Sequence, residues 1–140
     1  MTRNIQLRKR YAGMDYSLEA KVEAREGVMI VTIVTEKIMF VVPSGETNPF
    51  TELLLQCVPG GSENLNGVPV LVVLREVQYL NSAGLGCLIT FHKKMKGRGR
   101  YAFCDIHPHV MEPITVTKLN ELFVMRGTEV NALEDRSWQE

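Results

Sequence analysis

The chain has no excess of charge of either sign, because 16 lysine and arginine residues balance 16 aspartate and glutamate residues. Proteins devoted to nucleic acid usually carry a basic excess, so this neutrality argues against that class. Long apolar runs are also lacking: the longest candidate, residues 28–34, is the size of a strand and far short of the ~20 residues of a membrane-spanning helix. We therefore expect no nucleic-acid partner and no insertion into a membrane.

Cysteine is scarce and has no pairing pattern. The three cysteines, Cys57, Cys87 and Cys104, are an odd number, lie far apart and form no CxxC pair. This pattern argues against a disulfide framework or a zinc site and suits a reducing cytoplasm. We interpret them as partly buried thiols that act as small hydrophobic side chains. The basic N-terminus is not followed directly by an apolar stretch, as a secretory signal would require.

What is present is typical of one globular domain. Of the 140 residues, 45% are hydrophobic and 23% are charged, and a chain of this length buries roughly two thirds of its unfolded surface. No repeat, low-complexity segment or linker divides the chain. We expect a flexible N-terminal tail at residues 1–14, a single domain at residues 15–134 and a C-terminal tail at residues 135–140 that frays.

Hydrophobic periodicity predicts strands and helices in alternation. A half-buried strand at residues 17–23 and a turn at Glu26-Gly27 predict a hairpin with residues 28–34. The other predicted strands are residues 38–42, 68–74 and 100–106, and the predicted helices are residues 49–57 (capped by Thr47 or Asn48), residues 82–96 and one that Pro108 opens. The unbroken aliphatic run at residues 68–74 favours a strand covered on both faces. Residues 128–133 are expected to form a last short strand or helix.

The most informative segment joins that buried strand to the helix at residues 82–96. It reads Tyr79-Leu80-Asn81-Ser82-Ala83-Gly84-Leu85-Gly86, and its small side chains leave the backbone open to a partner. We predict Ser82 as the N-cap, beside unpaired amides and the positive end of the helix dipole. A phosphate on Ser82 would be stabilised there and would place about two negative charges where a partner docks. The spacing alone allows both a capping and a switching role.

This segment resembles the signature of STAS domains (sulfate transporter and anti-sigma factor antagonist), and most of all that of free-standing bacterial anti-sigma factor antagonists. Their motif reads Asp-Ser-Ser/Ala-Gly-Leu-Gly after an aliphatic strand, and residues 81–86 match five of its six positions. The similarity extends from Ser17 to Leu133, with the predicted elements in the same order. It implies an α/β fold, a STAS-like single domain with a mixed sheet of about four to five strands and helices packed mainly on one face.

The resemblance also implies a function and a site. In this family a kinase that is itself an anti-sigma factor phosphorylates the serine aligned with Ser82, and only the unmodified form binds the kinase and frees a sigma factor. Ser82 is therefore the expected phosphoacceptor. The expected partner-binding residues are Tyr79, Leu80, Asn81, Ser82, Ala83, Gly84 and Leu85. The expected partner is a protein, an anti-sigma factor or serine kinase, in the bacterial cytoplasm, and a homodimer is left open.

Three positions depart from the family pattern. The family usually has an aspartate before the serine, where this chain has Asn81, and an acid after the second strand, where it has Ile38. An aspartate often found on the buried strand falls at Val73. Asn81 can still hydrogen-bond but supplies no charge. Two interpretations follow: either the partner has diverged to match, or Ser82 is no longer phosphorylated and the protein binds constitutively.

Two other functions stay open. One is a STAS subunit of a membrane transport assembly, docking on an ABC permease or its ATPase. The other is a scaffold or nucleotide-sensing STAS module that is not phosphorylated. Neighbouring permease genes would favour the first of these, and a neighbouring kinase gene would favour the anti-sigma factor antagonist.

No other motif indicates catalysis or metal binding. His107 and His109 lack further ligands and are interpreted as a loop before a helix, and His92 as a histidine at the edge of the core. Ser82 lacks the glycine two residues earlier that a nucleophile elbow needs. We expect no catalytic residue, no metal, no cofactor and no enzymatic activity. A basic cluster could bind phosphate groups, although a solvated face is the simpler interpretation; it consists of Lys93, Lys94, Lys96, Arg98 and Arg100.

Overall fold

A mixed, five-stranded sheet organises the computed structural model, which describes residues 2–11, 13–39, 48–58, 68–96 and 99–140. Across the sheet the order is β1 (Thr2–Tyr11), β2 (Met14–Arg25), β3 (Val28–Ile33), β5 (Val70–Val73) and β7 (Tyr101–Cys104). The first three strands pair antiparallel, and β3, β5 and β7 pair parallel. Two short strands, β4 (Lys37–Ile38) and β6 (Tyr79–Leu80), form a separate parallel pair. The predicted α/β fold with a mixed sheet is confirmed.

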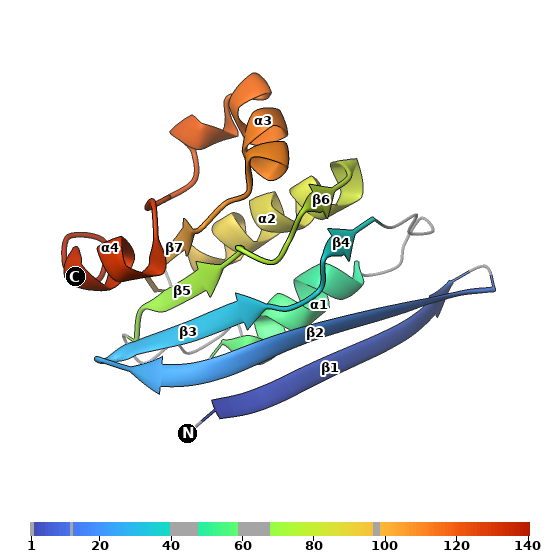
Figure 1. The fold of residues 1–140 in the computed structure, drawn as a ribbon, viewed down its shortest axis with the longest axis horizontal. Helices are drawn as coiled ribbons and strands as arrows, with labels where there is room; N and C mark the ends of the chain where they lie inside the picture. The colour runs from blue at the N-terminus through green and yellow to red at the C-terminus, as the bar shows by residue number, and fades with distance from the viewer. Residues whose placement is uncertain (1, 12, 40–47, 59–67, 97–98) are drawn as a thin grey trace.

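The N-terminal segment is a strand, and the expectation of a flexible tail at residues 1–14 is wrong. β1 runs along the edge of the sheet beside β2, from Thr2 opposite Glu23 to Tyr11 opposite Met14 (Figure 1). Its partly buried Ile5 and Leu7 pack against the main core. Ile5 and Leu7 are two residues apart, as strand residues on one face are, but the basic and amide side chains around them make this pattern weak in the sequence.

The hairpin between β2 and β3 is confirmed at the predicted turn. Glu26 and Gly27 both have positive φ, 55° and 78°, as a type I′ turn requires. On β2, Leu18, Ala20 and Val22 are buried, so the alternation predicted for this strand is present. The strand begins at Met14, earlier than expected, because it also pairs with β1.

Helices α1 (Pro49–Cys57) and α2 (Ser82–Met95) lie against one face of the sheet, where the larger core forms (Figure 1). The buried residues of α2 recur at the helical period and are Gly84, Cys87, Leu88, Phe91 and Met95. Asn48 caps α1, because its side chain accepts the backbone N–H of Phe50 at 2.9 Å. The alternative cap, Thr47, lies outside the described residues, as do residues 40–42 of the predicted third strand.

The opposite face of β3, β5 and β7 is covered by α4 (Glu129–Glu134) and the C-terminal segment. Trp138 is only 6% exposed, and its indole N–H donates to the backbone oxygen of Ala132 at 2.7 Å. The expectation that residues 135–140 fray is therefore wrong at this tryptophan. A second, smaller core unites Trp138 and Ala132 with buried strand residues that include Leu71 and Val73.

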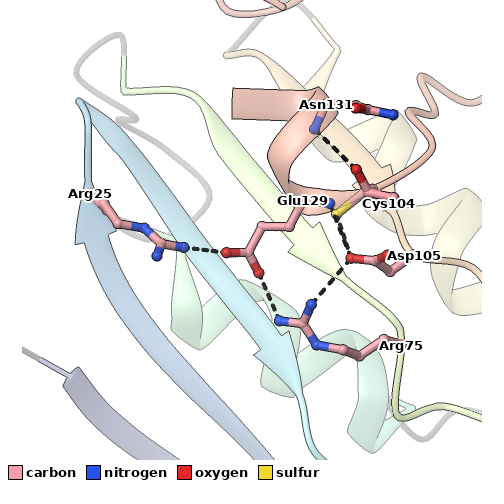
Figure 2. Close-up of polar contacts among 7 residues, drawn as sticks. Arg25, Arg75, Cys104, Asp105, Glu129 and Asn131 are labelled. Atoms are coloured by element: carbon pink, nitrogen blue, oxygen red, sulfur yellow. Dashed lines mark hydrogen bonds and ion pairs between the residues drawn. The ribbon is translucent and has the colours of Figure 1, made fainter. Parts of the chain in front are cut away.

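An ion-pair network holds the start of α4 (Figure 2). The Glu129 carboxylate lies 2.7 Å from Nη2 of Arg75 and also pairs with Arg25. An Asp105 carboxylate oxygen lies 3.3 Å from Nη1 of Arg75 and accepts the backbone N–H of Glu129 at 3.1 Å. The network joins residues that follow β5 and β7 to the end of β2, so α4 is fixed to both ends of the central strands.

The chain between β7 and α4 forms α3 (Pro108–Val116) and the short 3-10 helix η1 (Leu119–Glu121). Pro108 occupies the first turn of α3, as predicted. Val110, Ile114 and Phe123 are buried against the main core. Within the described ranges, every helix is too short or too polar to cross a lipid bilayer.

Candidate functional site

The candidate site lies where β6 ends and α2 begins. β6 pairs with β4, which places Lys37 opposite Tyr79 and Ile38 opposite Leu80. The backbone N–H of Asn81 donates to the carbonyl of Ile38 at 3.1 Å, which extends this pairing to the start of the helix. The first turn of α2 is therefore anchored to β4.

Asn81, and not Ser82, is the N-cap of α2. The Asn81 side chain accepts the backbone N–H of Gly84 at 3.0 Å, and the Asn81 backbone is extended. The predicted capping role of Ser82 is wrong because Asn81, an equally good cap, already fills it. Ser82 occupies the first helical position and is exposed. Its hydroxyl lies at the surface beside the N-terminal amides of the helix.

An aromatic side chain and a cation meet at this end of the fold. Tyr79 is 42% exposed. The Lys37 ammonium lies 5.6 Å from the centre of the Tyr79 ring, within the range of a cation–π contact. The His109 ring, at the start of α3, lies 5.8 Å from it, centre to centre. We call Lys37, Tyr79, Ser82 and His109 the α2-start surface.

The seven predicted partner-binding residues differ in burial. Tyr79 and Ser82 are exposed, Gly84 is buried, and the half-buried residues are Leu80, Asn81, Ala83 and Leu85. A Cβ at Gly84 would lie 2.5 Å from Cδ1 of Leu80 and 3.0 Å from both Cγ2 and the carbonyl oxygen of Ile38. Gly84 thus allows α2 to pack closely on β4, and it lies buried beneath the α2-start surface.

Sequence reasoning did not predict Lys37 and His109 at this surface. Both are distant from Ser82 along the chain. The pairing of β4 with β6 places Lys37 beside Tyr79, and the position of α3 places His109 there. Pro108 correctly predicted where α3 begins. No local pattern, however, indicated which neighbour α3 would contact.

The positions that depart from the family pattern lie in different surroundings. Ile38 is fully buried and packs beside Gly84, and Val73 is buried in the smaller core. The first turn of α2 contains no acidic residue. Because the N-terminus of a helix favours negative charge, a phosphate on Ser82 would meet a favourable potential with no carboxylate in that turn to oppose it.

The histidine pair near α3 has a structural role. The His107 side chain accepts the backbone N–H of His109 at 3.2 Å and so caps α3. No group of three histidine, cysteine, aspartate or glutamate residues within the described ranges could hold a metal ion. The imidazoles of the pair therefore serve the helix start and the contact with Tyr79.

The three cysteines are buried, as expected of small hydrophobic side chains. Burial raises the pKa of the Cys57 and Cys104 thiols to about 12 and also raises the pKa of Cys87. The thiols therefore stay protonated at neutral pH, which removes the thiolate that cysteine chemistry needs.

Comparisons with known sequences match almost the whole domain. A family model described as the STAS domain matches residues 19–132. A curated relative from Paenibacillus polymyxa, an anti-sigma F factor antagonist, is 24% identical over 121 residues, which make up 85% of this chain and 95% of the relative. The match begins inside β2, so β1 lies outside the part that the family model describes.

Solved structures of similar proteins share the fold. An anti-sigma-factor antagonist (STAS) domain protein from Planctomyces limnophilus has a TM-score of 0.63 at 19% identity, with 82% of this chain and 95% of that chain covered. An anti-sigma factor antagonist from Mycobacterium paratuberculosis has a TM-score of 0.58 at 19% identity, with 84% and 95% covered. Sequence identity this low supports a common architecture and no more.

Proposed function

The chain belongs to the STAS domain family, and on that premise we propose that it is an anti-sigma factor antagonist. It binds an anti-sigma factor through the α2-start surface and thereby frees the sigma factor that this partner would otherwise hold. The protein acts by binding and not by catalysis, and the exchange takes place in the cytoplasm. The curated relative named as an anti-sigma F factor antagonist supports this class of partner.

The observation that carries the proposal is the exposed hydroxyl of Ser82 at the first position of α2. Small and half-buried neighbours, such as Ala83, leave space for a partner to approach the helix start. The exposed ring of Tyr79, with Lys37 on its face, offers an aromatic anchor of the kind that dominates protein interfaces.

Ser82 is the proposed phosphoacceptor of a partner that is also a kinase. Its Oγ would attack the γ-phosphorus of ATP, the bond from that phosphorus to the bridging oxygen would break, and ADP would leave. A base on the kinase would take the hydroxyl proton. The product carries about two negative charges at the centre of the docking surface, and desolvating them against the partner would weaken the complex.

The neutral residue before Ser82 bears on the partner as well. Asn81 keeps the cap, and hence the geometry of the first turn, without an aspartate. A partner fitted to this chain therefore needs no cation to pair with a carboxylate at that position. If the partner does not phosphorylate Ser82, the same surface makes the protein a constitutive binder.

The test combines the purified chain with each anti-sigma factor kinase of its own genome. Calorimetry with ADP measures binding, and intact mass after incubation with ATP measures phosphoryl transfer. We expect one kinase to bind and to add one phosphoryl group to the wild type and none to Ser82→Ala. Ser82→Asp should bind at least about tenfold more weakly, which corresponds to about 1.4 kcal/mol.

A control variant separates the surface from the fold. Val130→Ser changes an exposed side chain on α4, against the opposite face of the sheet, and should bind as tightly as the wild type. Tyr79→Ala should weaken binding. Absence of binding to every kinase tested refutes the proposed function, whereas binding without phosphoryl transfer refutes only the switch at Ser82.

A further inference from the structure

A second feature lies at the other end of α2. A cavity of about 510 Å³ opens among the last turn of α2, the start of β7 and the segment that follows η1, with Trp138 of the C-terminal segment in its wall. Its volume falls within the range of roughly 300–1,000 Å³ that is usual for sites of small molecules. The α2-start surface lies at the first residue of this 14-residue helix, and the cavity lies at its last turn.

The ionisable side chains at the cavity that carry charge at neutral pH are all cationic. Lys96, Arg100 and Arg126 line it, and none of its described lining residues is a carboxylate. The Arg126 guanidinium is already paired with Asp135, at 2.6 Å from its Nε. Lys96 and Arg100 are exposed and form no ion pair with any residue in the described part of the chain. Two cations are thus available to an incoming ligand.

The wall of the cavity is apolar and aromatic. Met95, Leu122 and Val124 contribute aliphatic surface, and Tyr101 and Trp138 contribute rings. The indole N–H of Trp138 is already used by the carbonyl of Ala132, so this ring presents apolar surface. A ligand that fills the cavity therefore needs an uncharged, hydrophobic portion.

The two uncharged polar side chains in the wall, His92 and Tyr101, contact each other. Nδ1 of His92 lies 2.7 Å from the Tyr101 hydroxyl, which also accepts the backbone N–H of Val124 at 3.3 Å. Burial lowers the pKa of His92, helped by the charges of Lys96 and Lys93, and raises the pKa of Tyr101 to about 12. The unpaired charge that a ligand meets therefore comes from Lys96 and Arg100.

We propose that this cavity binds a small amphipathic anion, a carboxylate or a phosphate ester joined to an apolar body. The anionic group pairs with Lys96 and Arg100, and the body lies against Met95, Leu122 and the aromatic rings. Charge-assisted hydrogen bonds to the arginine and lysine fix the orientation, and burial of apolar surface supplies the rest of the affinity. The site does not depend on Ser82 or on any protein partner.

The single tryptophan of the chain gives a direct readout, because Trp138 lines the cavity. Octanoate, octyl phosphate, 1-octanol, octyltrimethylammonium and acetate are titrated below any micelle concentration, with fluorescence and calorimetry in parallel. We expect saturable binding of at least one of the two octyl anions. It should be at least about tenfold tighter than that of 1-octanol, and acetate and the octyl cation should give no response at the same concentrations.

Two variants place the binding at this cavity. The double variant Lys96→Gln and Arg100→Gln changes exposed side chains and should weaken octyl anion binding at least about tenfold. Lys94→Gln removes an exposed lysine of α2 that does not line the cavity, and it should leave binding unchanged. Ser82→Asp should also leave it unchanged, which keeps this test separate from that of the proposed function.

Three outcomes would overturn the proposal. The first is the absence of saturable binding, by both methods, for octanoate and for octyl phosphate. The second is binding of 1-octanol as tight as that of the anions, which would mean that the cations play no part. The third is an equal loss in Lys94→Gln and in the double variant, which would place the anion elsewhere on the basic end of α2. A response to octanoate alone, or to octyl phosphate alone, supports the site and identifies its preferred anion.

Discussion

Asn81 accepts the backbone N–H of Gly84 at 3.0 Å, so the residue that precedes the exposed Ser82 also holds the first turn of α2. We expect Asn81→Ala to lower the free energy of unfolding by about 1 kcal/mol, because an unpaired helix amide replaces the cap. Asn81→Asp keeps the cap and adds a charge that the helix dipole favours, so it should be as stable as the wild type or more so by about 0.3–1 kcal/mol. Urea denaturation measures both, and an alanine variant as stable as the wild type contradicts the capping role.

The two glycines of the first turns of α2 should respond in opposite ways to alanine. At Gly84 a methyl group would meet Leu80 and Ile38 at 2.5–3.0 Å, so Gly84→Ala should cost about 1–3 kcal/mol through overpacking. At Gly86 nothing lies within 4 Å of the added carbon, so Gly86→Ala should stabilise the helix by about 0.5–1 kcal/mol. Thermal or urea unfolding of the pair decides this, and a stabilised Gly84→Ala would contradict the packing of α2 on β4.

Local patterns predicted the elements whose side chains repeat regularly. The Glu26-Gly27 turn, the helix at residues 82–96 and a cap at Thr47 or Asn48 were all readable, because each depends on a few neighbouring residues. The strand at residues 2–11 was missed because Ile5 and Leu7 are its main apolar signal among basic and amide side chains. Their burial depends on contacts with core residues that lie far from them in the sequence. The ion pair between Lys9 of β1 and Glu52 of α1 likewise joins residues that are distant in the sequence.

The candidate site was predictable in part for the same reason. The motif at residues 81–86 indicated the helix start and an exposed Ser82, although two good capping residues in succession moved the cap by one position. Lys37 and His109 depend on tertiary pairing, which no short segment encodes. The structural role of Trp138 was also hidden, since a single aromatic residue near a terminus has no periodic context.

The network around Glu129 should make stability depend on acid pH. Burial, the largest effect, raises the pKa of Glu129, but hydrogen bonds from Arg75 and Arg25 and the charges of both arginines together lower it below its ordinary value of 4.5. The carboxylate therefore stabilises the fold fully above that value, and its contribution is lost as the pH falls through the folded-state pKa. We expect Glu129→Gln to be less stable than the wild type at neutral pH.

The quantity to measure is the difference in stability between the wild type and Glu129→Gln at each pH, because the contributions of the other acidic groups are the same in both proteins and cancel. Urea midpoints should differ at neutral pH and converge as the pH falls below about 4. Arg75→Gln offers a second test, because it removes the partner of both Glu129 and Asp105. A gap between wild type and Glu129→Gln that stays constant down to low pH would contradict an ionised, paired Glu129.

The C-terminal segment should behave as part of the fold because Trp138 covers the smaller core. Trp138→Ala exposes that core and should cost about 3–5 kcal/mol, the usual loss for a large buried aromatic side chain. Trp138→Phe keeps much of the apolar cover but leaves the Ala132 carbonyl without its indole donor, and should cost about 1 kcal/mol for the hydrogen bond. Circular dichroism follows unfolding in all variants, since two of them lack tryptophan. Val130→Ala, on the exposed side of α4, should have a free energy of unfolding within about 0.5 kcal/mol of that of the wild type. A Trp138→Ala protein that unfolds at the wild-type midpoint would mean that this segment frays in solution and that α4 alone covers the sheet.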